Sequence, residues 1–79
     1  MTFVYLLQSE ADPLRYYVGL SNDPARRLEE HNGGKSIHTN KYRPWSVVVT
    51  VGFADPAKAT AFEDYLKSGS GRAFAKKHF

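Results

Sequence analysis

Five residues of this chain have side chains that could act together on a phosphate ester. They are two tyrosines, an arginine, a histidine and a glutamate: Tyr5, Tyr17, Arg27, His31 and Glu63. A guanidinium is always charged and offers fixed donors to the negative charge that develops on phosphoryl oxygens. One carboxylate with water molecules is an ordinary Mg²⁺ site, and such an ion can acidify water. Histidine can take a proton at neutral pH, whereas a free phenol, with a pKa of about 10, is a poor base.

The two tyrosines lie in short runs that predict a β-hairpin. The runs Phe3–Leu7 and Arg15–Leu20 are rich in β-branched and aromatic residues, and a polar stretch separates them. Side chains alternate in direction along a strand, so a loop centred near Ala11 would place Tyr5 opposite Tyr17 on one sheet surface. A one-residue slip would separate them onto opposite surfaces.

A helix is predicted over Ala25–His31. Three consecutive N-capping residues and a proline precede it, and an Asn-Gly-Gly sequence follows it. Ala25 and Leu28 define a narrow stripe that should be buried, with His31 beside it.

The two adjacent arginines of this helix should differ in their surroundings. At 100° per residue, Arg27 lies on the flank of the apolar stripe and should reach the sheet. Arg26 points to nearly the opposite side and should be solvated. Arg27 is therefore the candidate for a site.

The following segment is polar and basic and predicts a loop over Gly33–Arg43, with one short helical turn around Ser36–Asn40. The strongest predicted strand is Trp45–Phe53, whose continuous valines indicate burial on both faces. Trp45 itself is expected in the core. A short terminal helix is expected over Arg72–His78.

A second long helix is predicted over Ala57–Lys67, with Asp55 as its cap and a proline directly after it. Its core stripe is expected to contain four residues, Ala59, Phe62, Tyr65 and Leu66. Glu63 lies at the edge of this stripe, whereas Asp64 points away from it.

These elements predict a single domain over residues 1–79 with an α+β fold. We expect a small three-stranded, mainly antiparallel sheet flanked by helices in the order β-β-α-β-α-α. The chain has no cysteine, which excludes disulfides and thiolate zinc clusters, and its net charge of +3 mildly favours a polyanionic partner. It carries no signal-peptide pattern and no apolar run long enough to span a bilayer, so a soluble cytoplasmic protein is expected.

The order and spacing of the motifs resemble those of the GIY-YIG nuclease domain over essentially the whole chain. The motifs that carry the resemblance are Phe3-Val4-Tyr5, Tyr17-Val18-Gly19, Arg27, His31 and Glu63. The resemblance is closest to small stand-alone bacterial members. The first motif is Phe-Val-Tyr instead of Gly-Ile-Tyr, which keeps the tyrosine. No asparagine follows Glu63, although many members carry one.

The resemblance implies a metal-dependent endonuclease that hydrolyses phosphodiester bonds in DNA, with a role in DNA repair or recombination. It implies that Arg27 stabilises the phosphoryl charge, that Tyr17 positions groups around the scissile phosphate, and that Glu63 binds one Mg²⁺ or Mn²⁺. Two proton routes stay open. Either Tyr5 is the base, its pKa lowered by Arg27 and the metal, or Tyr5 orients water while His31 takes the proton.

Further residues are candidates for contacts to nucleic acid. Gly19 would let a phosphate approach the backbone. A rim of basic residues could track phosphates or be an ordinary solubilising surface: Lys35, Lys41, Arg43, Lys67 and Arg72.

Two other classes of function remain alternatives at this point. One is a nucleic-acid-binding module of the same fold that is catalytically weak or inactive. The other is an interaction protein whose tyrosine face docks another chain. Specificity could also come from a protein partner.

Overall fold

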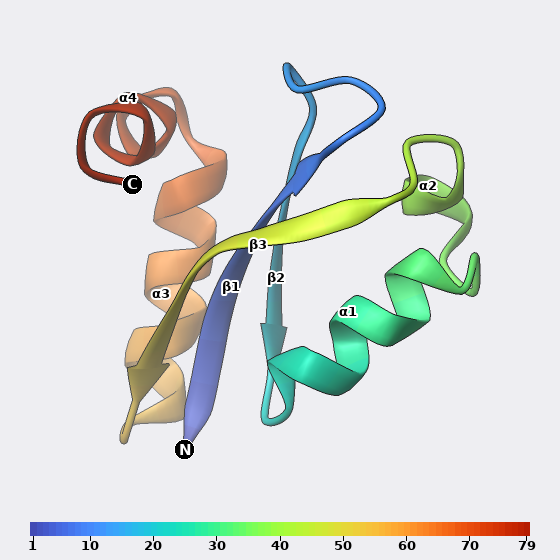
Figure 1. Ribbon diagram of the computed structural model, residues 1–79. Coiled ribbons are helices and arrows are strands. Elements are labelled where there is room, and N and C mark those ends of the chain that lie inside the picture. The colour runs from blue at the N-terminus through green and yellow to red at the C-terminus, as the bar shows by residue number, and fades with distance from the viewer.

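A three-stranded antiparallel sheet in the order β2-β1-β3 forms the centre of the computed structural model, which describes residues 1–79 (Figure 1). The elements in chain order are β1 (Thr2–Ser9), β2 (Tyr16–Ser21), α1 (Pro24–Asn32), α2 (Ile37–Asn40), β3 (Trp45–Phe53), α3 (Pro56–Lys67) and α4 (Gly69–His78). The α+β fold predicted from the sequence is confirmed, and the expected helical turn is α2. None of the helices combines the length and the apolar character that a membrane span requires.

The hairpin of β1 and β2 has a register two residues away from the predicted one. Tyr5 lies opposite Gly19, and Tyr17 lies opposite Leu7. The cause is the turn, which Asp12 organises by accepting hydrogen bonds from two following backbone N–H groups, one at its carboxylate (3.1 Å) and one at its carbonyl (2.9 Å). A shift of two residues keeps every side chain on its predicted face, so both tyrosines still share one surface.

β1 is the central strand and is the most buried one. The prediction that β3 is buried on both faces is wrong, because β3 pairs only with β1 and lies at the sheet edge. Val47 is 42% exposed, and Thr50 is also exposed. β3 also carries one residue more than β1 at the step where Leu6 pairs with Val49 and Leu7 pairs with Val47.

The helices α1 and α3 cover opposite faces of the sheet (Figure 1). On one face, Val4 of β1 packs against Ala59 and Leu66 of α3. On the other face, Tyr5 and its neighbours pack beneath α1. We call these the α3 face and the α1 face.

Two predicted core positions are exposed instead. Tyr65 is 40% exposed and packs by its ring against Phe62 and Phe74 at the surface of α3 and α4, while Phe62 is partly buried as expected. Ala25 lies exposed on the first turn of α1. The buried residue of that helix is His31.

Side-chain caps begin three of the helices, α1, α3 and α4. The Asp23 carboxylate accepts from the backbone N–H of Arg26 at 3.1 Å in α1, and Asp55 caps α3 in the same way. α4 begins at Gly69 rather than at Arg72, because the Ser68 hydroxyl accepts from a backbone N–H in its first turn.

Candidate active site

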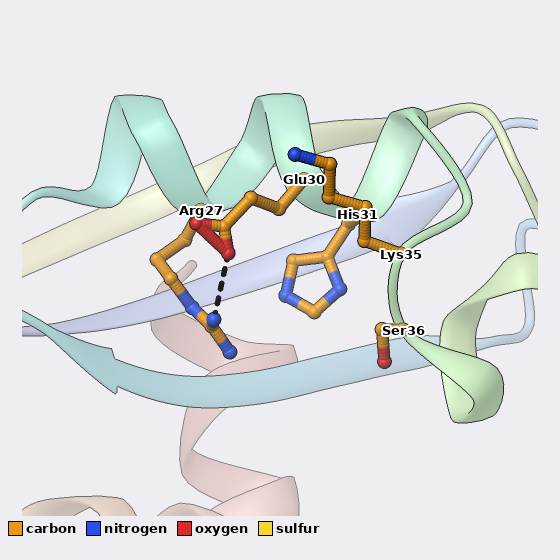
Figure 2. A pocket seen from close by; sticks show the side chains of 5 residues that line it. All are labelled: Arg27, Glu30, His31, Lys35 and Ser36. Atoms are coloured by element: carbon orange, nitrogen blue, oxygen red, sulfur yellow. Dashed lines mark hydrogen bonds and ion pairs between the residues drawn. The ribbon is translucent and has the colours of Figure 1, made fainter.

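A pocket of about 260 Å³ opens on the α1 face, between α1 and the loop that follows it (Figure 2). Its lining is entirely polar and consists of Arg27, Glu30, His31, Lys35 and Ser36. Arg27 and His31 project from α1 toward the sheet (Figure 2). The pocket therefore presents a guanidinium, an imidazole and an ammonium group within one small polar hollow.

His31 joins this pocket to the tyrosine surface of the sheet. Its Nε2 lies 3.1 Å from the Tyr5 hydroxyl, and its ring centroid lies 4.7 Å from that of Tyr17. The two tyrosine rings are 6.1 Å apart, so the predicted pairing of the phenols on one surface is confirmed. Tyr5 and His31 are each only 1% exposed. Bulk water therefore does not compete for the hydrogen bond between them.

Thr39 of α2 completes the set of partners of His31. Its hydroxyl lies 2.8 Å from His31 Nδ1 and is as deeply buried as the imidazole. A neutral imidazole has one donor and one acceptor nitrogen. Because both nitrogens have a partner, the tautomer that His31 adopts depends on Thr39 as well as on Tyr5.

Other hydrogen bonds hold these elements in place. The Asn32 side chain at the end of α1 donates to the Trp45 carbonyl at 3.0 Å and accepts from the Trp45 backbone N–H at 2.6 Å. The Trp45 indole N–H donates to the Thr39 carbonyl at 2.8 Å. Trp45 is 4% exposed, which confirms its predicted place in the core. These bonds tie α1, α2 and the start of β3 together around His31.

Gly19 makes room for the Tyr5 ring. A Cβ built at this position would overlap the Tyr5 Cζ and hydroxyl and would lie 2.8 Å from Cε1. The glycine therefore lets the phenol lie flat against the neighbouring strand, where its hydroxyl reaches His31. This packing role is an alternative to the close phosphate approach that the sequence suggested.

Arg27 and Arg26 differ as predicted. The Arg26 side chain is 60% exposed, whereas that of Arg27 is 37% exposed and enters the pocket. Arg27 Nη1 donates to Glu30 at 2.9 Å, and Arg26 lies 3.7 Å from the same carboxylate group. Glu30 thus holds the Arg27 guanidinium in place and partly neutralises it.

Burial shapes the proton chemistry of the site. Burial raises the pKa of Tyr5 above its ordinary value of 10.0, and the nearby Arg27 guanidinium opposes this without cancelling it. Burial, and then the charge of Arg27, lower the pKa of His31 from 6.5. His31 is therefore a neutral imidazole at neutral pH, and Tyr5 is a protonated phenol. Arg27 thus acts on the pKa of Tyr5 in the expected direction, but burial outweighs it in the protein without a metal ion.

Glu63 lies outside this pocket. It is on α3, which packs on the α3 face, and its carboxylate is 3.5 Å from Lys67 Nζ. The Glu63 side chain is 18% exposed, so it sits at the edge of the core stripe as predicted. Nowhere in the chain do three or more acidic or histidine side chains gather as a preformed metal site. Both α1 and α3 contact β2, so the helices that carry Arg27 and Glu63 share this edge strand as a neighbour.

The predicted basic rim divides into two surfaces. Lys35 lines the pocket, and at the same end of the molecule Lys41 lies over the Tyr42 ring, 5.6 Å from its centroid. Lys67 and Arg72 line a different groove, between α4 and the α3 face of the sheet.

The sequence reasoning missed one site residue, Thr39. It falls in a polar segment without periodicity, and a lone threonine there carries no signal. Glu30 follows Arg27 by three residues, a spacing that is typical of helical ion pairs and accounts for the contact.

Known proteins with similar sequences are structure-specific endonuclease subunits. SLX1 of Scheffersomyces stipitis is 41% identical over 66 residues, covering 76% of this chain and 19% of the relative. The relative from Talaromyces stipitatus is 45% identical over 65 residues (75% and 17%), and the SLX1 homolog of Giardia intestinalis is 35% identical over 65 residues (77% and 18%).

The chain thus spans about a fifth of the length of these relatives. They are eukaryotic and long, so they give no support to the expected closeness to small bacterial proteins. The model of the GIY-YIG catalytic domain matches residues 1–77, and this chain therefore belongs to the GIY-YIG family.

Proposed function

We propose that this protein is an endonuclease that hydrolyses phosphodiester bonds in DNA, and that it prefers branched DNA of the kind formed in repair and recombination. The observation that carries the proposal is the buried hydrogen bond between Tyr5 and His31 beside the Arg27 guanidinium, at the base of an open polar pocket. The preference for branched DNA rests on the relatives, which are named structure-specific endonuclease subunits.

His31 is the proposed proton acceptor. It is neutral at pH 7, and its Nε2 faces a phenol that does not ionise by itself. The attacking water gives its proton to the Tyr5 oxygen while Tyr5 gives its own proton to His31 Nε2. The resulting hydroxide forms a bond to phosphorus, the bond to the leaving ester oxygen breaks, and that oxygen is protonated from solvent.

This route requires Nδ1 of His31 to carry the hydrogen. The nearby Arg27 guanidinium has donors only, so its interaction with the phenol uses the Tyr5 oxygen as acceptor and leaves the Tyr5 O–H for Nε2. Nδ1–H then donates to the Thr39 hydroxyl. Thr39 is accordingly a positioning residue that holds the imidazole in the productive tautomer.

Arg27 and Lys35 supply positive charge for the phosphate. A guanidinium held by Glu30 is already oriented, so little side-chain freedom is lost when a phosphoryl oxygen binds. Lys35 is exposed at the pocket rim, and it would contact a neighbouring phosphate of the backbone. Tyr17, which packs on the His31 ring, is proposed to position the groups around the scissile phosphate.

Glu63 is the proposed ligand of one divalent ion, Mg²⁺ or Mn²⁺. The residues present fit such an ion, because this part-buried carboxylate has only a half-exposed lysine as its partner, and Mg²⁺ is commonly held by one carboxylate with water and substrate oxygens. When bound, the ion supplies charge neutralisation and acidifies water. Because the helices that carry Glu63 and Arg27 both contact β2, we propose that the substrate backbone crosses this strand.

A cleavage assay with matched arginine variants tests the proposal. Supercoiled plasmid and branched oligonucleotides are incubated with Mg²⁺ or Mn²⁺ and the wild type, Arg27→Ala or Arg26→Ala. We expect the wild type and Arg26→Ala to nick the plasmid and to cleave the branched oligonucleotides. The cleavage rate of Arg27→Ala should be lower by about a hundredfold or more. Equal activity of both variants would show a contaminating nuclease or a wrong site.

A second candidate function is a DNA-binding module without turnover. The ion pair between Arg27 and Glu30 favours it, because a partly neutralised guanidinium suffices for binding. This candidate requires salt-sensitive binding of DNA together with no cleavage at any tested concentration of either metal ion.

The relatives are named subunits, and we propose that this protein also works together with a partner chain. The partner would contribute to substrate choice.

A further inference from the structure

A second hollow, of about 780 Å³, lies on the α3 face of the sheet between α4 and the hairpin. We call it the α4 groove. Its floor is aliphatic and is formed by Leu6, Val18 and Val48, one residue from each strand. α3 covers the other half of this face, around Val4, and leaves this half open. The groove is therefore a concave apolar surface on the side of the sheet opposite to Tyr5.

The rim of the α4 groove gathers exposed apolar side chains. Leu14 is 88% exposed, Tyr16 is 56% exposed and Phe79 is 38% exposed, and all three line the groove. Single exposed apolar residues are normal at a protein surface, but three around one apolar hollow mark an interaction surface.

The charges at the groove are all positive. No aspartate or glutamate lines it. Its polar lining residues are one amide and four cations, Gln8, Arg15, Lys67, Arg72 and Lys76. Arg15 already pairs with Asp12 at 3.5 Å, and Lys67 pairs with Glu63. Arg72 and Lys76 have no ion pair, and they lie one helical turn apart on α4.

We infer that the α4 groove binds an acidic segment of a partner polypeptide that carries apolar side chains. The aliphatic floor gains about 25 cal/mol for each Å² of apolar surface that it removes from water, and apolar side chains of a peptide supply such surface. DNA would offer phosphates to these cations, but it has no aliphatic side chains to cover the floor formed by Leu6, Val18 and Val48. Two carboxylates of the segment complement Arg72 and Lys76.

This inference deepens the proposed association with a partner chain, and it does not depend on the nuclease chemistry. The groove and the pocket lie on opposite faces, so a segment bound in the groove leaves the pocket around Arg27 and His31 open. The bound segment would contact Leu6, the immediate neighbour of Tyr5 in β1.

A displayed library of random peptides, each about 16 residues long, selected on the immobilised protein, tests the inference. We expect recovered peptides to combine aspartate or glutamate with leucine, isoleucine or phenylalanine. Their affinities are then measured by fluorescence polarisation with three variants at exposed positions. Lys76→Glu and Leu14→Ser should each weaken binding about tenfold, whereas Lys77→Glu, which makes the same charge change outside the groove, should not.

Three results would overturn the inference: no enriched peptide, enriched peptides without acidic residues, or affinities that Lys76→Glu and Leu14→Ser leave unchanged. Displacement of the peptide by branched DNA, with chemical-shift changes at Val18 and Val48, would show instead that the groove binds DNA. Arg27→Ala separates the two proposals, because it should lose cleavage and still bind the peptides.

Discussion

Replacing Thr39 by valine removes a hydroxyl from the centre of the site while keeping the shape of the side chain. In the wild type this hydroxyl lies 2.8 Å from His31 Nδ1, and both residues are 1% exposed. No water can take its place, so Nδ1–H loses its only partner. An unpaired buried donor costs about 1–3 kcal/mol. The Trp45 indole bond should survive, because it uses the Thr39 carbonyl.

The imidazole of Thr39→Val can avoid this cost by moving its hydrogen to Nε2. That tautomer donates to the Tyr5 oxygen and cannot accept its proton. A shift of about 1–3 kcal/mol in the tautomer equilibrium corresponds to a rate loss of about 5- to 150-fold. The assay is single-turnover cleavage of a branched oligonucleotide, with ¹⁵N NMR of the His31 ring to read the tautomer directly.

Two variants control this experiment. Thr39→Ser keeps the hydroxyl and should retain cleavage within about threefold together with the Nδ1–H tautomer. Thr60→Val makes the same chemical change at an exposed position of α3 and should have no effect. If Thr39→Val unfolds at lower urea concentration but cleaves at the wild-type rate, Thr39 supports the fold and does not position His31, and the proton route is refuted.

Three further predictions follow from the site. Gly19→Ala should destabilise the protein by about 1–3 kcal/mol in urea unfolding, because the new methyl group meets the Tyr5 ring; Gly69→Ala, with no atom near its Cβ, should not. The pKa of His31 is lowered in the folded protein, so the unfolded chain takes up its proton at a higher pH. The stability that neutral His31 contributes is then fully present above about pH 6.5 and is lost as the pH falls from there through the lower pKa of the folded protein. Between about pH 7.5 and about pH 5.5, the free energy of unfolding should fall less in His31→Gln than in the wild type. An equal fall in both proteins would show that His31 is not the cause. EDTA and Glu63→Ala should each abolish cleavage without changing the circular dichroism spectrum, whereas Asp64→Ala should be active; cleavage that persists in EDTA would rule out the divalent ion.

The sequence predicted features that depend on local periodicity. The side of α1 that carries Arg27 and His31 follows from 100° per residue, and the shared surface of Tyr5 and Tyr17 follows from strand alternation. The register did not follow, because the turn centre depends on how Asp12 folds the loop. Because side chains alternate with a period of two, a register error of two residues keeps each side chain on its predicted face. The predicted sheet faces of Tyr5 and Tyr17 were therefore right, while their predicted cross-strand partners were wrong.

Features that depend on how whole helices and strands are arranged in space could not be predicted from local sequence patterns. A run of valines indicates apolar surroundings but does not say whether a strand is central or at an edge, and β3 proved to be at the edge. In the same way, the helical stripe placed Glu63 at the edge of α3 without showing which sheet face α3 covers. Thr39 reaches His31 only through the path of α2, which local patterns do not encode.

The central position of β1 restricts where this protein can change length. Successive residues of β1 contribute to opposite surfaces of the sheet. Tyr5 contacts His31 on the α1 face, and Leu6 lines the α4 groove on the α3 face. Deleting one residue before Tyr5 would turn every following side chain of the strand over and damage both surfaces together. Added or lost residues in the exposed hairpin tip would leave the β1 side chains on their faces, so natural length variation should accumulate there, with the α4 groove rim at Leu14 as the part that changes.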